Sequence, residues 1–443
     1  MRPLESCLAS FREWLYLPDP GALEVAIATA AANYAEGDAL WLLLVGAPGS
    51  GKTEILIPLG SLPDARLVAT LTEGGLLSGT PKHERSKTAS GGLLRELGAF
   101  GILIAKDFGS ILSMNRDTRA VLLAALREIY DGAWTRHVGV DGGKSLSWQG
   151  KVAIIGGCTP AIDSHHAVLS SMGERFLLYR IHVADARSHA ASAIGHIGHE
   201  REMRQQLAKA VAAVVDDADQ DVLVGHPAPE ARSRLIDLAQ LVARARSSVE
   251  RDGYKREIEL VPDSEAPGRL SIQLLRLLNG LLAIGVAEAR AWELVTKTAL
   301  DSMPAIRRGV LDCFIAAGGA RTTTEVALAV DYPTATTRRT LEDLAAHGVL
   351  QRSSLGKGKA DLWHLAEWVR ELKSLSFSEK SVQAGVGVGK RSESSLYIAT
   401  DNSEKPSFNG FGSSLFDDAY ELNEVMGAEL DAEAAALAQE LEA

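Results

Sequence analysis

A glycine-rich loop that directly follows a short apolar run restricts the possible folds of this chain more than any other feature. Residues 40–45 are continuously apolar, which is typical of a strand buried on both faces of a parallel sheet. The loop after it fits the pattern G-x-x-x-x-G-K-[ST] and consists of Gly46, Ala47, Pro48, Gly49, Ser50, Gly51, Lys52 and Thr53. Its glycines let backbone N–H groups surround a phosphate at the start of the next helix. We therefore predict a phosphate site here, with Lys52 on the β- and γ-phosphates of a nucleotide and Thr53 on Mg²⁺.

Further apolar runs at residues 65–71, 101–105 and 151–155 alternate with helical patterns. Strands that alternate with helices predict a three-layer α/β fold with a parallel sheet. From about residue 189 to residue 297 we find only helical periodicity and expect no strand. The phosphate loop should therefore lie at one edge of a P-loop sheet, with an all-helical segment after it.

A nucleotide-hydrolysing site also needs a carboxylate at the end of a neighbouring strand, and Asp107 follows the run at 101–105. The usual pattern is four apolar residues followed by Asp-Glu, in which the Asp orients Mg²⁺ and the Glu polarises water. Here Lys106 stands in the magnesium position and Asp107 in the water-activating position. A shift of one residue would place Asp107 on the metal and leave no base. The sequence leaves both roles open, as well as an ordinary strand-end Asp, and it predicts slow hydrolysis or a nucleotide-controlled switch.

Two more groups of polar residues follow the predicted strands. Thr159, after the run at 151–155, is a candidate to sense the γ-phosphate and position water, or it could cap the turn before Pro160. His189, His196 and His199 lack the cysteines or the H-E-x-x-H pattern of a zinc site, and we expect them to be solvated helix residues.

Three segments carry a resemblance to a known family. Residues 76–92 form a polar loop with the basic residues Lys82, Arg85 and Lys87, and residues 172–181 contain Gly-Glu-Arg-Phe around Arg175. Between them, apolar alternation on both sides of Asp141-Gly-Gly-Lys144 predicts a β-hairpin with Lys144 at its tip. With the phosphate loop, these segments make residues 38–300 resemble the AAA+ ATPases, in particular the branch with minichromosome-maintenance helicases and bacterial enhancer-binding activators.

The resemblance implies ATP and Mg²⁺ as ligands and a hexameric ring with ATP between subunits. Lys82, Arg85, Lys87 and Lys144 would then face DNA in a central pore, although Lys144 could also be incidental to a surface hairpin. Arg175, or as second choice Arg180, would be an arginine finger that stabilises the γ-phosphate of the neighbouring subunit. The alternative for Arg175 is a structural ion pair with Glu174. Arg269, in Pro-Gly-Arg-Leu, would contact the nucleotide from an all-helical lid, or be structural.

Residues 303–368 resemble a winged helix-turn-helix. A helix that begins near Thr334 presents Arg338 and Arg339, and a basic turn with Lys357 and Lys359 separates two short strands. Guanidinium groups at a helix N-terminus suit a DNA groove, and lysines on a wing suit phosphates. The alternative is a winged helix that makes protein contacts inside a ring.

The charge of the chain is uneven along its length. The net charge is −11, but residues 416–443 hold nine acidic residues and no Lys or Arg, so the remainder carries only −2. We expect residues 369–443 to be a disordered linker with an acidic tail that binds a protein partner. With no apolar run near the roughly 20 residues of a membrane span and no signal sequence, we expect a cytoplasmic protein. The expected divisions are residues 1–38, 39–187, 188–302, 303–368 and 369–443.

These features together predict an ATP-dependent DNA motor, a ring-forming replication initiator or helicase of a phage or mobile element. The alternative is a nucleotide-controlled DNA-binding transcriptional regulator without helicase activity. Enhancer-binding activation is disfavoured because residues 76–92 lack the Gly-Ala-Phe-Thr-Gly-Ala loop of those activators. A third hypothesis is a nucleotide-gated defence or assembly ATPase.

Overall fold

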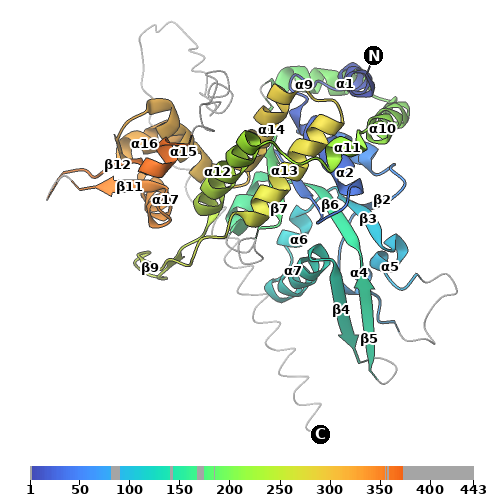
Figure 1. Ribbon diagram of the computed structural model, residues 1–443, viewed down its shortest axis with the longest axis horizontal. Helices are drawn as coiled ribbons and strands as arrows, with labels where there is room; N and C mark the ends of the chain where they lie inside the picture. The colour runs from blue at the N-terminus through green and yellow to red at the C-terminus, as the bar shows by residue number, and fades with distance from the viewer. Residues whose placement is uncertain are drawn as a thin grey trace, which may run out of the picture. The chain divides into compact units, whose positions relative to one another are not determined.

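A five-stranded parallel sheet lies at the centre of the fold, with helices on both of its faces (Figure 1). The computed structural model describes residues 2–80, 90–139, 143–166, 174–183, 185–354, 356 and 359–372. The strands run in the order β2-β3-β6-β1-β7, and their bounds are β1 Trp41–Val45, β2 Ala65–Val68, β3 Phe100–Ala105, β6 Lys151–Cys158 and β7 Phe176–Arg180. The predicted parallel α/β sheet is thus confirmed. The strand β7 was not expected from the sequence.

The register of the sheet brings three strand ends together. Val45, the last residue of β1, pairs with Cys158 of β6, and Ala105, the last residue of β3, pairs with Gly156 of β6. Because all three strands are parallel, the segments that follow them emerge at one edge, here called the carboxyl edge. The opposite, amino edge contains the starts of the same strands.

Alternating side chains of the strands divide the core into two layers. Leu42 and Leu44 pack with one set of helices, whereas Trp41, Leu43 and Val45 face another. The first face is covered by α2 (Gly21–Tyr34) and α3 (Lys52–Leu59), with α1 (Pro3–Trp14) farther out, and the second by α5 (Leu93–Leu97), α6 (Gly109–Leu112) and α7 (Arg116–Tyr130). All residues of α2 from Gly21 to Asn33 are buried, including the polar Glu24, Thr29 and Asn33.

Two antiparallel strands extend from the second face (Figure 1). They are β4 (Ala133–Val138) and β5 (Lys144–Gln149), in which Trp134 pairs with Trp148. The predicted β-hairpin is therefore confirmed. Arg136 holds it against the segment around α4 (Glu73–Leu76), donating to the Leu77 carbonyl over 2.7 Å and pairing with Glu73 at 3.0 Å.

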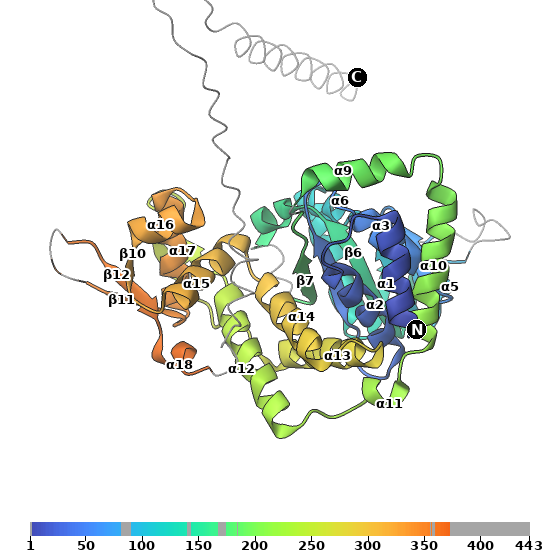
Figure 2. The same cartoon turned by 90° about the horizontal axis from the view of Figure 1, so that it is seen from above.

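The segment after the sheet is mostly helical. Its helices are α9 Ala186–Gly195, α10 Glu200–Asp216, α11 Gln220–Leu223, α12 Pro229–Arg246, α13 Gly268–Ala283 and α14 Glu288–Asp301. Figure 2 shows α12, α13 and α14 side by side. The expectation of no strand here was wrong, because β8 (Glu250–Arg251) and β9 (Ile258–Leu260) form a hairpin. These strands are too short and too charged for a recognisable apolar alternation.

The C-terminal domain combines helices with a small three-stranded sheet. Its elements are α15 Ala305–Ala317, β10 Arg321–Thr322, α16 Thr323–Val330, α17 Thr334–Ala346, β11 Leu350–Ser353, β12 Leu362–Leu365 and α18 Glu367–Arg370. Thr322 and Glu325 form a capping box at the start of α16, and Asp331 takes the left-handed conformation (φ 54°) that ends it. Strands β11 and β12 pair antiparallel as a wing. The winged helix-turn-helix is thus confirmed.

Several predictions lie outside the described residues. They concern Lys82, Arg85 and Lys87 in the polar loop, Lys357 on the wing, and residues 373–443 of the segment 369–443. At the start of that segment the expected disorder was wrong, because Val369 is buried and belongs to α18 (Glu367–Arg370). The domain divisions stay predictions. Among the helices that the structure describes, none combines the length and the apolar character needed to cross a membrane.

A half-buried lysine at the start of β6 gives a prediction about pH. Lys151 donates to the Ala35 carbonyl at the end of α2, and burial lowers its pKa to about 7. Below pH 7 Lys151 is charged in both the folded and the unfolded chain, and the partial burial of this charge destabilises the folded state. Above the unfolded pKa of about 10.4 neither state is charged. Relative to wild type, Lys151→Met should therefore raise the free energy of unfolding most below pH 7. This increase should become smaller toward pH 10.

Urea denaturation of both proteins from pH 6 to pH 10 measures this trend. Lys209→Met, at an exposed position of α10, is the control and should show a difference that does not depend on pH. A Lys151→Met difference of equal size at pH 6 and pH 10 would contradict the burial argument.

Candidate functional site

The glycine-rich loop adopts a backbone that only glycine accommodates easily. Gly49 and Gly51 have φ values of 75° and 81°, and α3 begins immediately afterwards at Lys52. At Gly46, an added Cβ would lie 2.6 Å from Ser50 Oγ, so the loop closes on itself there. The predicted strand, loop and helix are therefore all present, with the start of α3 directed toward the space that the loop surrounds.

The side chain of Lys52 turns back into this loop. Its Nζ donates to the carbonyls of Gly46 and Ala47 over 2.7 and 2.8 Å and lies 3.2 Å from Ser50 Oγ. Burial lowers the pKa of Lys52, and the carboxylate of Asp107 acts in the opposite direction. The ammonium group is thus held where a phosphate would enter, and Asp107 is near enough to influence it.

Asp107 lies at the end of β3, exposed at the carboxyl edge. Its Oδ1 accepts from the Gly109 N–H over 3.0 Å, and the next residue, Phe108, donates its N–H to the Gly157 carbonyl over 2.7 Å. Lys106 and Thr53 are also exposed. The exposed carboxylate of Asp107 and the exposed hydroxyl of Thr53 are suitable ligands for Mg²⁺. The choice between metal ligand and water-activating base for Asp107 stays open.

Thr159 follows β6, the strand between β1 and β3. It occupies the N-cap position of the 3₁₀ helix η3 (Pro160–His165), but its side chain makes no capping hydrogen bond. The capping alternative is therefore not observed, and the hydroxyl lies at the same edge as the phosphate loop. Its role as a γ-phosphate sensor stays a prediction.

One residue at this edge was missed in the sequence analysis. A Cβ on Gly51 would lie 3.7 Å from Nε2 of His189, which α9 brings next to the phosphate loop. Of the other two histidines, His196 stacks edge-on against Trp14 with ring centroids 5.1 Å apart. His199 is exposed, as expected for a solvated histidine, whereas His189 and His196 are half-buried and keep only part of their surface in solvent. The sequence offered no signal, because the approach of α9 depends on the tertiary fold.

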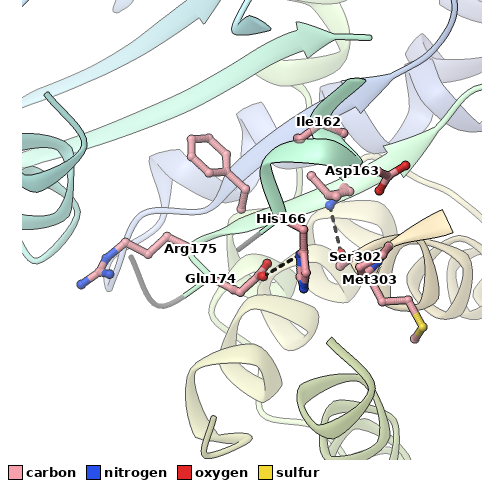
Figure 3. A pocket seen from close by; sticks show the side chains of 10 residues that line it. Ile162, Asp163, His166, Glu174, Arg175, Ser302 and Met303 are labelled. Atoms are coloured by element: carbon pink, nitrogen blue, oxygen red, sulfur yellow. Dashed lines mark hydrogen bonds and ion pairs between the residues drawn. The ribbon is translucent and has the colours of Figure 1, made fainter. Parts of the chain in front are cut away.

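Arg175 lies at the amino edge, directly before β7. Its side chain is 5% exposed, its Nη2 is 2.9 Å from Asp131 Oδ2, and the guanidinium lies over the Tyr130 ring at 5.3 Å. Figure 3 shows it pointing away from the neighbouring Glu174. Among the residues that the structure describes, the acidic partner of Arg175 is therefore Asp131, and not Glu174 as the structural alternative supposed. The arginine-finger role stays a prediction, and it requires the contact with Asp131 to change.

Arg180, the second candidate, lies at the other end of β7. Its guanidinium makes two hydrogen bonds to Asp163, of 2.7 and 2.9 Å, and donates to the carbonyls of Asp301 and Met303. In this chain Arg180 therefore joins the sheet to the end of α14. This arrangement gives Arg180 a structural task and favours Arg175 as the finger candidate.

Arg269 is in the first turn of α13 and pairs with Glu265 at 3.3 Å. Its charge acts on the pKa values of Tyr130 and Arg175, which lie at the amino edge. Gln273, one turn along α13, donates to the Arg175 carbonyl over 2.7 Å. The structure thus brings Arg269 together with Arg175, and not with the phosphate loop of the same chain.

A small pocket lies between η3, β7 and the start of α15 (Figure 3). Its lining does not include the phosphate loop and consists of Ile162, Asp163, His166, Glu174, Arg175, Phe176, Leu178, Ser302, Met303 and Pro304. Within it, His166 pairs with Glu174 at 3.4 Å, and Glu174 lies 3.9 Å from the buried Arg246 at the end of α12. His166 Nε2 is 2.6 Å from the Arg246 carbonyl. This cluster joins the amino edge of the sheet to the helical segment.

The candidate DNA-binding residues lie on α17 and on two hairpins. Arg338 and Arg339 are exposed on α17, and Arg338 pairs with Glu342 at 3.0 Å. Lys359 is exposed on the wing. Lys144 is the first residue of β5 and is half-buried opposite Val138. The groups suited to phosphate contact thus lie on separate parts of the chain.

Two arginines hold α17 against the rest of the chain. Asp343 of α17 accepts from Arg251 of β8 over 2.7 Å and from Arg307 of α15 over 3.0 Å. Arg307 also donates to the carbonyls of Ala245 and Ser247, directly after the buried end of α12. The helix-turn-helix is therefore connected by hydrogen bonds to the same segment that contacts Glu174.

Comparison with known proteins identifies the C-terminal domain. Residues 309–354 match the IclR helix-turn-helix domain, which covers α16, α17 and most of α15. No characterised protein gave a significant match to the chain. The chain thus contains a helix-turn-helix domain of a DNA-binding type at its C-terminal end.

The carboxylate of Asp343 should contribute strongly to stability. Asp343→Asn would remove the negative charge that faces Arg307, which is only 8% exposed, and we expect a loss of about 2–3 kcal/mol in the free energy of unfolding. Urea denaturation measures it. Asp361→Asn is the control: its partner Arg352 is 44% exposed, and the expected loss is below about 1 kcal/mol. Equal losses in the two variants would contradict the importance of this contact.

Proposed function

We propose that this chain is an ATP-binding and hydrolysing DNA motor of the AAA+ type that acts as a ring, as replication initiators and helicases do. The observation that carries the proposal is the gathering of Lys52, Asp107 and Thr159 at one edge of a parallel sheet. A phosphate loop, a carboxylate and a hydroxyl on neighbouring strand ends are the parts of a nucleotide-hydrolysing site. The helix-turn-helix domain in the same chain supports DNA as the partner.

Each residue at the carboxyl edge has a distinct task in this proposal. The backbone N–H groups of the loop and Lys52 bind the phosphates, and Thr53 with Asp107 would hold Mg²⁺, which neutralises phosphate charge when bound. Thr159, or Asp107 in its other role, orients the attacking water. Because Lys106 stands where the usual pattern has a metal-binding Asp, we expect hydrolysis to be slow.

The amino edge supports action between copies of the chain. Arg175 and Arg269 lie on the side of the sheet opposite the phosphate loop, so neither reaches the nucleotide of its own chain without a large rearrangement. Arg175 pairs with Asp131 and Arg269 pairs with Glu265, so a second copy that docks its carboxyl edge there would have to displace these contacts. An interface of this kind is heterologous, and it gives the proposed ring when the rotation between copies closes.

DNA would be bound at two places. Arg338, Arg339 and Lys359 would contact duplex DNA through α17 and the wing, with arginines placed for the groove and the lysine for the phosphates. Lys144, on the β4–β5 hairpin, would contact DNA in the centre of the ring.

A second candidate function is a nucleotide-controlled transcriptional regulator. It is favoured by the match to an IclR helix-turn-helix domain and by the Lys106 substitution in the carboxylate pattern. In that case ATP would change the affinity for duplex DNA without unwinding it.

Strand displacement on a forked substrate separates the two candidates. The motor predicts ATP-dependent unwinding that is lost in Lys52→Ala, because the γ-phosphate loses its cation, while duplex binding persists. Lys209→Ala, which removes an exposed lysine of α10, should unwind normally. Tight duplex binding without unwinding or appreciable turnover in the wild-type protein would support the regulator and contradict the motor.

The position of His189 predicts a contribution to nucleotide binding. Because its ring lies beside Gly51, His189→Ala should raise the Kd for ATP by about three- to tenfold through loss of one hydrogen bond or packing contact. Equilibrium binding of a fluorescent ATP analogue measures the change. His196→Ala, from the other end of the same helix, should have less than a twofold effect. Unchanged binding in His189→Ala would exclude this contribution.

A further inference from the structure

We propose that the tip of the β8–β9 hairpin, with Tyr254, Lys255 and Arg256, binds the phosphate backbone of duplex DNA next to the groove that α17 enters. This inference rests on the proposed function, in that the helix-turn-helix must bind DNA, which both candidate functions share. It goes further because it assigns a binding site to the helical segment, outside the helix-turn-helix and its wing.

The hairpin does not contribute to the core of the fold. None of residues 250–260, all of which the structure describes, is buried. Tyr254 is 94% exposed, the highest value among the large apolar residues that the structure describes, and Lys255 and Arg256 beside it are exposed as well. A projecting aromatic ring with two cations, on a loop without a packing role, is typical of a binding surface.

The carboxylate of Asp252 holds the tip in one shape. It accepts the N–H groups of Tyr254, Lys255 and Glu257 over 2.8, 2.7 and 3.0 Å. These hydrogen bonds, with the one from Lys255 contributing most, lower the pKa of Asp252. Arg256 completes the turn in the left-handed conformation, with a φ of 61°. The tip is therefore preorganised, and little conformational entropy is lost when it binds a ligand.

A single arginine fixes the hairpin to α17. The guanidinium of Arg251 donates to the Arg256 carbonyl at the tip over 2.6 Å and to the Arg339 carbonyl of α17 over 3.1 Å. The tip therefore lies beside the helix on which Arg338 and Arg339 are exposed (Figure 1). The second helix of a helix-turn-helix lies in the major groove. An element fixed alongside that helix lies where the phosphates that border the groove pass.

The charges around the tip also favour a polyanion. The acids of the hairpin and of the adjoining part of α17 are Glu250, Asp252, Glu257, Glu259, Glu342 and Asp343. The two on α17 pair with Arg251 at 3.2 and 2.7 Å, and the first, second and fourth lie in the strands or within the turn. Glu257 directly follows Arg256 and is exposed. Neither Lys255 nor Arg256 forms an ion pair with a residue that the structure describes, so phosphates would supply the counter-charge.

Apolar residues of the hairpin lie at its base and not at its tip. Leu260 and Val261, at the end of β9, are 53% and 42% exposed. A protein partner that buries apolar surface would contact this base. The tip instead combines a tyrosine hydroxyl with two cationic groups, all of which donate hydrogen bonds to phosphate oxygens.

The test compares Lys255→Ala/Arg256→Ala with Arg201→Ala/Lys209→Ala, which removes an equal charge from exposed positions of α10. Fluorescence anisotropy gives the Kd of each full chain, with ATP, for a labelled mixed-sequence duplex between about 50 and 200 mM salt. We expect the tip variant to raise the Kd about tenfold or more at the lower salt and to reduce the slope of log Kd against log salt by about two. The control should keep the wild-type Kd and slope.

Two further variants separate a DNA contact from a structural role of the hairpin. Lys255→Arg/Arg256→Lys keeps both charges and should bind DNA as the wild-type protein does. Glu257→Gln removes the acid next to the tip and should lower the Kd by about twofold or more, because its repulsion of phosphates is lost. Damage to the fold of the hairpin would not produce this gain in affinity.

A tip variant with the wild-type Kd and salt slope would overturn this inference, and so would an unchanged Kd in Glu257→Gln. The proposed function would stand in that case if Arg338→Ala/Arg339→Ala still weakened binding. Wild-type protein that binds no duplex DNA would instead refute the DNA partner of the proposed function.

Discussion

Parallel pairing of β1 with β6 and β7 gives the sheet two chemically different edges, and every functional inference depends on their separation. The carboxyl edge holds the phosphate loop, Asp107 and Thr159, because these segments follow strands that end at the same level. The amino edge holds Arg175 beside Tyr130 and Asp131. A strand of β1's length keeps the two groups apart within one chain, so a site that needs both must be shared between chains.

A buried cluster of charges connects the amino edge to the DNA-binding domain. Arg246 is 1% exposed and lies between Glu174, which precedes Arg175, and Glu265, which pairs with Arg269. The carbonyls beside Arg246 accept hydrogen bonds from Arg307, which in turn pairs with Asp343 of α17. Buried charges of this kind are stable only with their partners in place. A change around Arg175 on assembly would therefore alter contacts that extend to the helix-turn-helix. Under the proposed function, these contacts would couple ATP to DNA binding.

Local patterns in the sequence predicted the structural motifs that depend on residues close together along the chain. The phosphate loop depends on its glycines and the hairpin around Lys144 on apolar alternation, and both are present. The strand β7 was not recognised, although it pairs with β1 along its whole length, because it ends in the polar pair Tyr179 and Arg180.

Contacts between residues that are far apart in the sequence could not be predicted from the sequence alone. Glu174 was the nearest acidic residue to Arg175 along the chain, yet the partner is Asp131, which the fold brings from 44 residues away. In the same way, nothing near His189 indicates that α9 returns to the phosphate loop, and nothing near Arg269 indicates that it lies beside Arg175. The identity of a site's parts could be predicted, but not the distances between them.

The central claim is that one chain's carboxyl edge and another chain's amino edge form a single ATP site. The most direct measurement is the rate of ATP hydrolysis per chain over a hundredfold range of protein concentration, with duplex DNA present. If the claim is correct, the rate per chain rises steeply with concentration and reaches a plateau once assembly is complete. A rate per chain that is constant over the whole range, from protein that sediments as a monomer, would contradict it.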